Sequence, residues 1–205
     1  MHDDDPPGWL ERLTHVPERV DVTAFRLRVL LLAALVLWSW FLLRMDYRTG
    51  DIMQSFLHRP LLVFHEAGHV VFMAFGEWIS VLGGTLGQLL MPLVLAGALL
   101  LRNQDPFGAA IGLWFFGVSV LDVAPYVYDA LEPRLMLLSG HTGAEGGGHD
   151  WMYLLDSMDL RHRARMLGGL VHTAGGATVL GALAWAGWLL LRQRRQLAGD
   201  VLHED

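Results

Sequence analysis

The hydrophobic positions of this chain gather in long runs instead of alternating with polar positions. The first run covers residues 25–44, FRLRVLLLAALVLWSWFLLR. A helix of about 20 apolar residues crosses a hydrocarbon core of ~30 Å. Trp38 and Trp40 stand toward one end of the run, where aromatic side chains anchor a helix at the membrane surface. The pattern therefore predicts a first membrane-spanning helix at 25–44.

Four further apolar runs predict four more spanning helices. The second covers residues 60–76, with Pro60 suited to the first position of a helix. The third ends near Leu101, and the last two cover 107–131 and 166–191. The chain is therefore expected to be an all-α membrane protein with about five transmembrane helices.

A Gly-rich segment, ISVLGGTLGQLLMP at 79–92, opens the third run and has two interpretations. Gly83 and Gly87 have the spacing of small residues at which membrane helices pack closely. Alternatively, the segment forms a re-entrant loop or hairpin whose free backbone pairs with an extended substrate. In that structure Gly83, Gly84 and Gln88 would contact the substrate.

The region between the fourth and fifth runs is polar at first and then amphipathic. Residues 132–150 contain HTGAEGGGHD and are expected to form a long loop. In 151–165, WMYLLDSMDLRHRAR, apolar residues recur at the spacing of one helical face. We expect an amphipathic helix that lies at the membrane interface.

Composition supports a membrane protein and excludes several other classes. Hydrophobic residues make up 53% of the 205, and cysteine is absent, so any metal site must use His, Asp or Glu. All basic residues are arginine, which is typical of a GC-rich genome, and we expect the bacterial cytoplasmic (inner) membrane. No basic stripe indicates nucleic-acid binding. The arginines divide almost evenly between the two predicted sides, so the positive-inside rule assigns no orientation.

The chain is expected to hold one membrane domain between two polar tails. The N-terminal tail, 1–24, contains DDDPPG and does not have the pattern of a cleaved signal peptide. The membrane domain covers 25–191, with its chemical core at 60–131. The C-terminal tail covers 192–205 and is rich in arginine.

The candidate chemistry lies in the second run, where HEAGH forms an H-E-x-x-H sequence. Residues four apart share one helix face, so His65 and His69 can bind the same metal ion. Glu66 is rotated away from that face, yet it can reach a water near the ion as a general base. Ionisable groups at membrane depth are costly and usually mark a site. We predict one Zn²⁺ per chain, because zinc accepts nitrogen and oxygen ligands and keeps a position open for water.

The third ligand has several candidates. Asp122 leads, because an unpaired carboxylate in the fourth run would be expensive, although it could instead pair with a polar group such as His172. Asp129 follows seven residues later on the same face, but we favour a boundary role for it. His149 and Asp150, after three glycines, are rivals. Asp150 would also make an ordinary helix N-cap.

His172 and His149 also have roles other than metal binding. His172 lies in the fifth run and could bind the metal or hydrogen-bond a carboxylate across helices; we lean to the second role. The glycines before His149 would let its loop fold back over the site, where His149 could contact substrate or support a metal ligand.

Together these motifs resemble the site-2 protease family of intramembrane zinc metalloproteases. The resemblance rests on H-E-x-x-H in a membrane helix, a Gly-rich segment, a further span, and a span that carries Leu121-Asp122. It covers residues 60–131, about a third of the chain. It implies a distant member of the family.

The resemblance also implies roles for particular residues. His65, His69 and Asp122 would bind zinc, and Glu66 would activate water. The segment around 83–88 would correspond to the membrane-associated loop on the family's substrate side. A membrane protein or peptide would be the substrate.

Three functions compete on this evidence. The first is an intramembrane zinc peptidase that acts on membrane-associated proteins. The second is a membrane-embedded metal-dependent hydrolase of lipid amides or esters, which a pocket of acyl-chain dimensions would favour. The third is a non-catalytic metal-binding membrane protein, in which protein ligands alone would complete the coordination.

Overall fold

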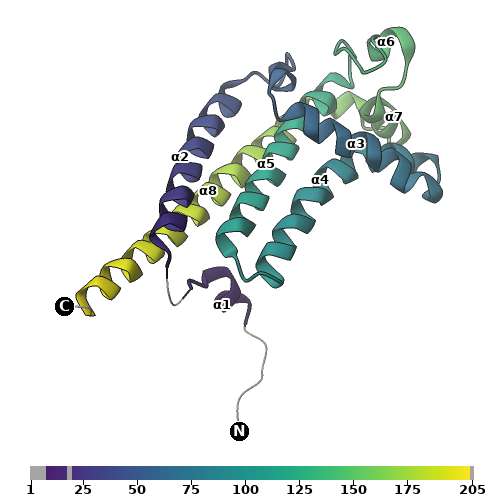
Figure 1. Ribbon diagram of the computed structural model, residues 1–205. Helices are drawn as coiled ribbons and strands as arrows, with labels where there is room; N and C mark the ends of the chain where they lie inside the picture. The colour runs from purple at the N-terminus through teal and green to yellow at the C-terminus, as the bar shows by residue number, and fades with distance from the viewer. Residues whose placement is uncertain (1–7, 18–19, 204–205) are drawn as a thin grey trace.

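The structure, a computed structural model, describes residues 8–17 and 20–203, with side chains through Ala198. Four long helices dominate it: α2 (Val22–Arg44), α4 (Glu77–Leu101), α5 (Pro106–Asp129) and α8 (Ala164–His203) (Figure 1). All four are long and apolar enough to cross a membrane. Within the described residues, the only strand-like pairing is an isolated bridge between Met136 and Thr142. The prediction of an all-α membrane protein is confirmed at this level.

Four of the described helices are candidate spans, one fewer than the prediction of about five. The second apolar run forms α3 (His58–Phe72) and a 3₁₀ turn at Met73–Phe75. At 1.5 Å per residue, its 15 residues extend about 22 Å, less than a ~30 Å hydrocarbon core. Gly76 has φ of +95° and turns the chain into α4. In Figure 1, α3 crosses the upper end of α4.

Residues 13–17 lie against the C-terminal half of α8. Residues 9–14 form a short helix, α1 (Trp9–Thr14), as the sequence WLERL suggests. Trp185 Nε1–H donates to the Leu13 carbonyl at 3.0 Å, and Arg192 donates to the Thr14 carbonyl at 2.9 Å. The five-span topology would have put these segments on opposite sides of the membrane.

The Gly-rich segment is part of the continuous helix α4, and the expected re-entrant loop or hairpin is not seen. Its glycines instead allow α3 and α4 to approach closely. A Cβ at Gly87 would lie 2.5 Å from the Phe64 carbonyl oxygen and 2.8 Å from the Cα of Gly68. A Cβ at Gly68 would overlap the carbonyl oxygen of Gly83. Close helix packing, the other interpretation of this segment, is the one that the structure supports.

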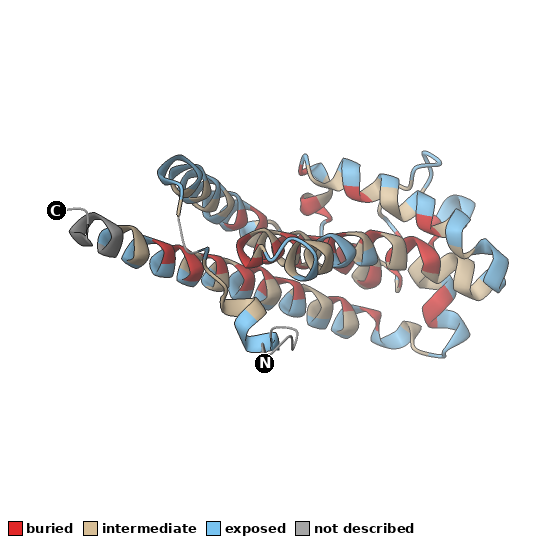
Figure 2. Cartoon of the chain, turned by 60° about the horizontal axis from the view of Figure 1, so that its bottom comes forward, coloured by how far each residue is buried: buried red, intermediate tan, exposed pale blue. Residues whose placement is uncertain are grey.

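The best-buried helix is α5, which packs between α4 and α8. Gly117 of α5 and Gly175 of α8 bring the two backbones together, because a Cβ at Gly117 would lie 2.8 Å from the Val179 nitrogen. Trp114 of α5 is buried and donates to Ser39 Oγ of α2 at 2.7 Å. Figure 2 shows the buried faces of these helices turned toward one another. Their outer faces are apolar and exposed, as lipid-facing helices require.

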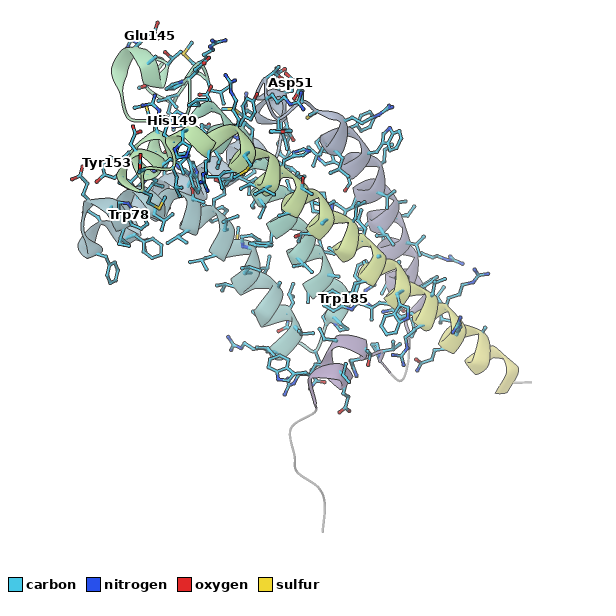
Figure 3. All side chains as sticks on the ribbon, turned by 180° about the vertical axis from the view of Figure 1, so that it is seen from behind. Asp51, Trp78, Glu145, His149, Tyr153 and Trp185 are labelled. Atoms are coloured by element: carbon cyan, nitrogen blue, oxygen red, sulfur yellow. The ribbon has the colours of Figure 1, made fainter. Side chains whose placement is uncertain are left out.

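Short elements cover the end of the bundle that holds α3. These are a 3₁₀ turn (Asp51–Gln54), α6 (Gly143–Gly146), α7 (Asp150–Ser157) and a second 3₁₀ turn (Arg161–Arg163). The predicted amphipathic helix at 151–165 is thus two pieces, because Asp159 has φ of +56° and breaks it. Figure 3 shows His149, Tyr153 and Trp78 gathered at this end and Trp185 far from it.

The helix α7 is amphipathic, as the sequence pattern predicted, and its apolar side packs against the bundle. Leu154 and Leu155 are buried. Trp78 Nε1–H at the start of α4 donates to Ser157 Oγ at 2.8 Å. The contact fastens α7 to the helix hairpin of α3 and α4.

We predict that Gly87→Ala destabilises the fold by about 1–3 kcal/mol, because the added methyl group would clash with the backbone of α3. Gly97→Ala, the same change in the same helix, meets nothing within 4 Å and should be neutral or stabilising by up to ~1 kcal/mol. Thermal unfolding in detergent measures both. Equal melting temperatures for the two variants would contradict the close α3–α4 contact.

Candidate metal centre

One face of α3 carries the candidate chemistry. His58, Leu62, His65, Glu66 and His69 all line the same cavity. Their spacing follows the 3.6-residue period, so they form one stripe along the helix. The stripe faces inward from the end of the bundle.

The cavity that this stripe lines has a volume of about 390 Å³. α3, α4, α5 and α7 form its walls, and parts of the loop between α5 and α7 cover it. Such a volume lies within the range of ~300–1,000 Å³ that is usual for ligand pockets. Apolar and polar side chains both line it; the apolar ones include Leu62, Val123, Leu137, Leu138 and Trp151.

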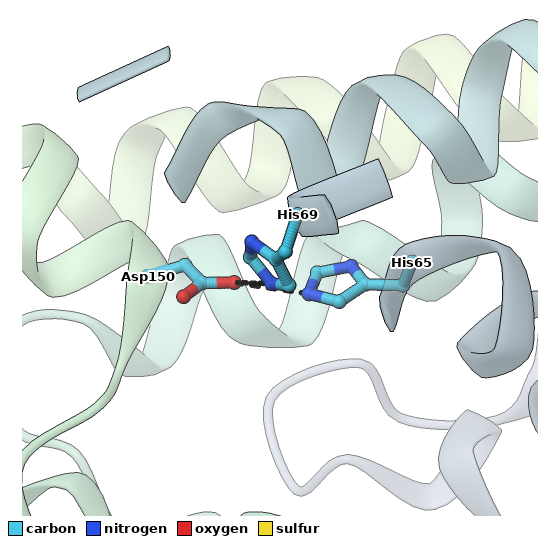
Figure 4. Close-up of side chains that lie close together, drawn as sticks. All are labelled: His65, His69 and Asp150. Atoms are coloured by element: carbon cyan, nitrogen blue, oxygen red, sulfur yellow. Dashed lines mark hydrogen bonds and ion pairs between the residues drawn. The ribbon is translucent and has the colours of Figure 1, made fainter. Parts of the chain in front are cut away.

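Three side chains converge on one point of the cavity wall: His65, His69 and Asp150 (Figure 4). One ligand atom from each lies within 4.8 Å of the other two. His65 Nε2–H donates to Asp150 Oδ2 at 2.9 Å, and Nε2 of His69 lies 3.2 Å from the same oxygen. Among the described residues, this is the group whose geometry could hold a metal ion.

The helix α4 fixes the orientation of the two histidines. His69 Nδ1–H donates to the Ser80 carbonyl at 2.8 Å, which leaves Nε2 as the free nitrogen. A Cβ at Gly84 would lie 2.6 Å from Nε2 of both His65 and His69. Glycine at this position therefore makes the space in which the imidazoles meet. Gly84 was predicted to contact the substrate, but its neighbours here are the two histidines that could hold the metal.

The third side chain, Asp150, lies at the start of α7. His149, not Asp150, is the N-cap: its Nδ1 accepts from the Met152 N–H at 3.1 Å. Asp150 is thereby the first helical residue and its carboxylate points to the histidines. Gly147 and Gly148 have φ of +73° and +77°, a conformation that lets the loop turn back toward α3.

Asp122, the leading candidate for third ligand, lies in the same cavity but outside this group. It is 3% exposed and accepts from His58 Nδ1–H at 2.9 Å and from Gln88 Nε2–H at 2.9 Å. His58 is seven residues before His65, about 10 Å along the helix. Asp122 is therefore held at the far end of the stripe. Its partner is His58 and not His172, the pairing that the sequence suggested.

The remaining candidates have structural partners. Asp129 accepts from the backbone N–H groups of Arg134 and Leu135 at 2.9 and 3.1 Å, which fits the boundary role favoured for it. Nε2 of the buried His149 lies 3.4 Å from Asp129 Oδ2, an ion-pair distance when the imidazole is protonated. His172 stacks on Tyr47 with ring centroids 4.4 Å apart.

Glu66 is exposed on α3 and lines the cavity beside the histidines. It makes no hydrogen bond or ion pair with another described residue. Burial disfavours a charge on His65, but the hydrogen bond and charge of Asp150, with the charge of Glu66, outweigh it. The pKa of His65, which lies outside the four candidate spans, is therefore raised. The negative potential that favours this proton would equally favour a divalent cation.

The donor set fits the zinc ion that the sequence predicts. Two imidazole nitrogens and a carboxylate oxygen are ligands that zinc accepts, and catalytic zinc sites use three protein ligands. The cavity adjoins the three donors and is also lined by Glu66, so it leaves space for a further ligand.

Several polar residues of this cavity were not predicted from the sequence, among them Thr85, Tyr126 and His58, which pairs with Asp122. A signal existed, because His58 precedes His65 by seven residues and so shares its helix face. Its position before Pro60 placed it outside the predicted second span.

Comparisons with known proteins do not add to this picture. No family model matches the chain, and no curated protein or solved structure matches it. The geometry of the site and the H-E-x-x-H motif are therefore the basis for inferring a function.

We predict that Asp150→Asn weakens zinc binding by at least about 100-fold, because the loss of a ligand exceeds the ~10–100-fold effect of losing a supporting partner. Asp122→Asn should retain one zinc per chain. Elemental analysis and titration against a chelating dye measure both variants. Zinc loss in Asp122→Asn with zinc retained in Asp150→Asn would favour Asp122 as the ligand.

Proposed function

We propose that this protein is a membrane-embedded zinc hydrolase that cleaves peptide bonds of membrane-associated proteins. The observation that carries the proposal is the convergence of His65, His69 and Asp150 on one cavity that also holds Glu66. Four candidate spanning helices support a membrane setting. The H-E-x-x-H motif, with its resemblance to the site-2 proteases, supports peptide hydrolysis over other uses of zinc.

Each residue has a task in this chemistry. His65, His69 and Asp150 would hold the ion, which when bound lowers the pKa of water to ~7 and polarises a carbonyl group. Glu66 takes a proton from the attacking water and returns it to the leaving amine. Its carboxylate is suited to this because no other described residue occupies it.

The site is less suited to a purely structural zinc. A structural zinc is enclosed by four protein ligands. Here three donors converge, and a cavity of about 390 Å³ adjoins them. The arrangement thus supports a hydrolase over the non-catalytic metal-binding protein.

One observation favours lipid amides or esters as a second substrate class. Because α4 is a continuous helix, its backbone groups are bonded internally and offer no edge for an extended peptide. The cavity combines apolar walls with a polar end, which suits an acyl chain next to an amide or ester. The same three ligands and the same Glu66 would serve this reaction.

We predict that Glu66→Gln keeps stoichiometric zinc and lowers kcat for fluorescein-labelled casein in detergent by at least about 100-fold, the lower range of general acid–base catalysis. Zinc analysis and a fluorescence assay on the same preparation measure the two properties. His65→Gln is the companion variant and should lose both zinc and activity. If zinc-loaded Glu66→Gln cleaves casein at the wild-type rate, the assigned role of Glu66 is wrong.

A lipid assay separates the two substrate classes. Wild type and Glu66→Gln are incubated with a panel of N-acyl and ester lipids, and mass spectrometry identifies the products. Glu66-dependent release of fatty acid, without casein cleavage, would assign the protein to the second class.

A further inference from the structure

Two kinds of buried polar group line the cavity: those with a hydrogen-bond partner and one without. Asp122 accepts from both His58 and Gln88, so these three side chains form one network. Thr85 Oγ1 lines the same cavity and has no hydrogen-bond partner, although Thr85 is only 4% exposed.

Several other Ser and Thr hydroxyl groups on the long helices donate to a backbone carbonyl of their own helix. Thr173 and Thr178 on α8 donate to the carbonyls four residues earlier, at 2.9 and 2.8 Å. Ser119 on α5 does the same at 3.0 Å. A threonine in a helix ordinarily satisfies its hydroxyl in this way. Thr85 does not, and its hydroxyl remains available on the cavity wall.

The place of Thr85 on α4 sets what it can reach. The preceding residue, Gly84, abuts Nε2 of His65 and of His69. Gln88, three residues later, shares the face of Thr85 and ties to Asp122. The hydroxyl therefore lies between the metal-binding histidines and the Asp122 network.

We propose that Thr85 is a substrate-binding residue whose hydroxyl donates to a carbonyl oxygen of the bound amide, next to the bond that is cleaved. The inference rests on the proposed hydrolase function and names the group that positions its substrate. A buried hydroxyl without a partner destabilises the chain, and a substrate carbonyl removes that penalty. Thr85 thus favours substrates whose hydrogen-bond acceptor lies between the two histidines and the Asp122 network.

The proposal predicts opposite effects of one substitution on stability and on binding. Thr85→Val keeps the shape of the side chain and removes only the hydroxyl, whereas Thr85→Ser keeps the hydroxyl. Thr85→Val should melt at the same temperature as the parent or higher, because no protein hydrogen bond is lost. It should bind an amide probe about five- to twenty-fold more weakly, and Thr85→Ser should bind within about two-fold of the parent.

Binding is measured in the zinc-loaded Glu66→Gln background by fluorescence anisotropy. One probe is a fluorescein-labelled hydrophobic peptide amide, and the other is a fluorescent N-dodecanoyl amide; the tighter binder identifies the source of the carbonyl. Mass spectrometry of the recovered probe checks that it stays intact, so a failure of the Glu66 assignment is seen separately.

Three results would overturn the proposal. They are undiminished probe binding by Thr85→Val, an equal loss in Thr85→Ser, and failure of the parent protein to bind either probe. A clear fall in the melting temperature of Thr85→Val would also overturn it, because the hydroxyl would then have a partner within the protein.

Discussion

The close contact between the backbones of α3 and α4 is the constraint on which the site depends. α3 is too short to span a bilayer and is held on the bundle through this contact. The absence of side chains at Gly68, Gly83 and Gly87 allows the approach, and Gly84 then leaves room for both imidazoles. Any larger side chain along this seam would move α3 outward. His65 and His69 would move with it, away from the carboxylate of Asp150.

Burial of charge explains how the polar residues are distributed. A carboxylate removed from water needs hydrogen bonds or a cation, and the three aspartates near the site meet this need with different partners. Asp122 uses His58 and Gln88, Asp129 uses backbone N–H groups, and Asp150 uses the two histidines. Of the three, Asp150 is the one whose partners are the two histidines of the H-E-x-x-H motif. That difference marks it as the third member of the centre.

The long helices could be predicted from the apolar runs of the sequence. Contacts between residues far apart in the sequence could not. The runs at 25–44 and 107–131 predicted α2 and α5 closely, because hydropathy and length suffice for a spanning helix. The run at 60–76 was wrongly predicted as a span, since its α-helix ends at Phe72 and a 3₁₀ turn and Gly76 follow. His65 and His69 came from local spacing, whereas Asp150 is 81 residues beyond His69. Its position depends on the loop and on capping by His149, which no local pattern encodes.

The continuity of α4 changes how a substrate must enter. A re-entrant loop would offer backbone groups along which an extended strand could pair over several residues. A continuous helix offers only side chains, so recognition would fall to Thr85 and Gln88 of α4 and to the other walls of the cavity. A cavity of about 390 Å³ accommodates the bond to be cleaved and its immediate neighbours. A transmembrane substrate would therefore have to unwind locally and present a single bond, while a lipid amide already presents one at the head of its chain.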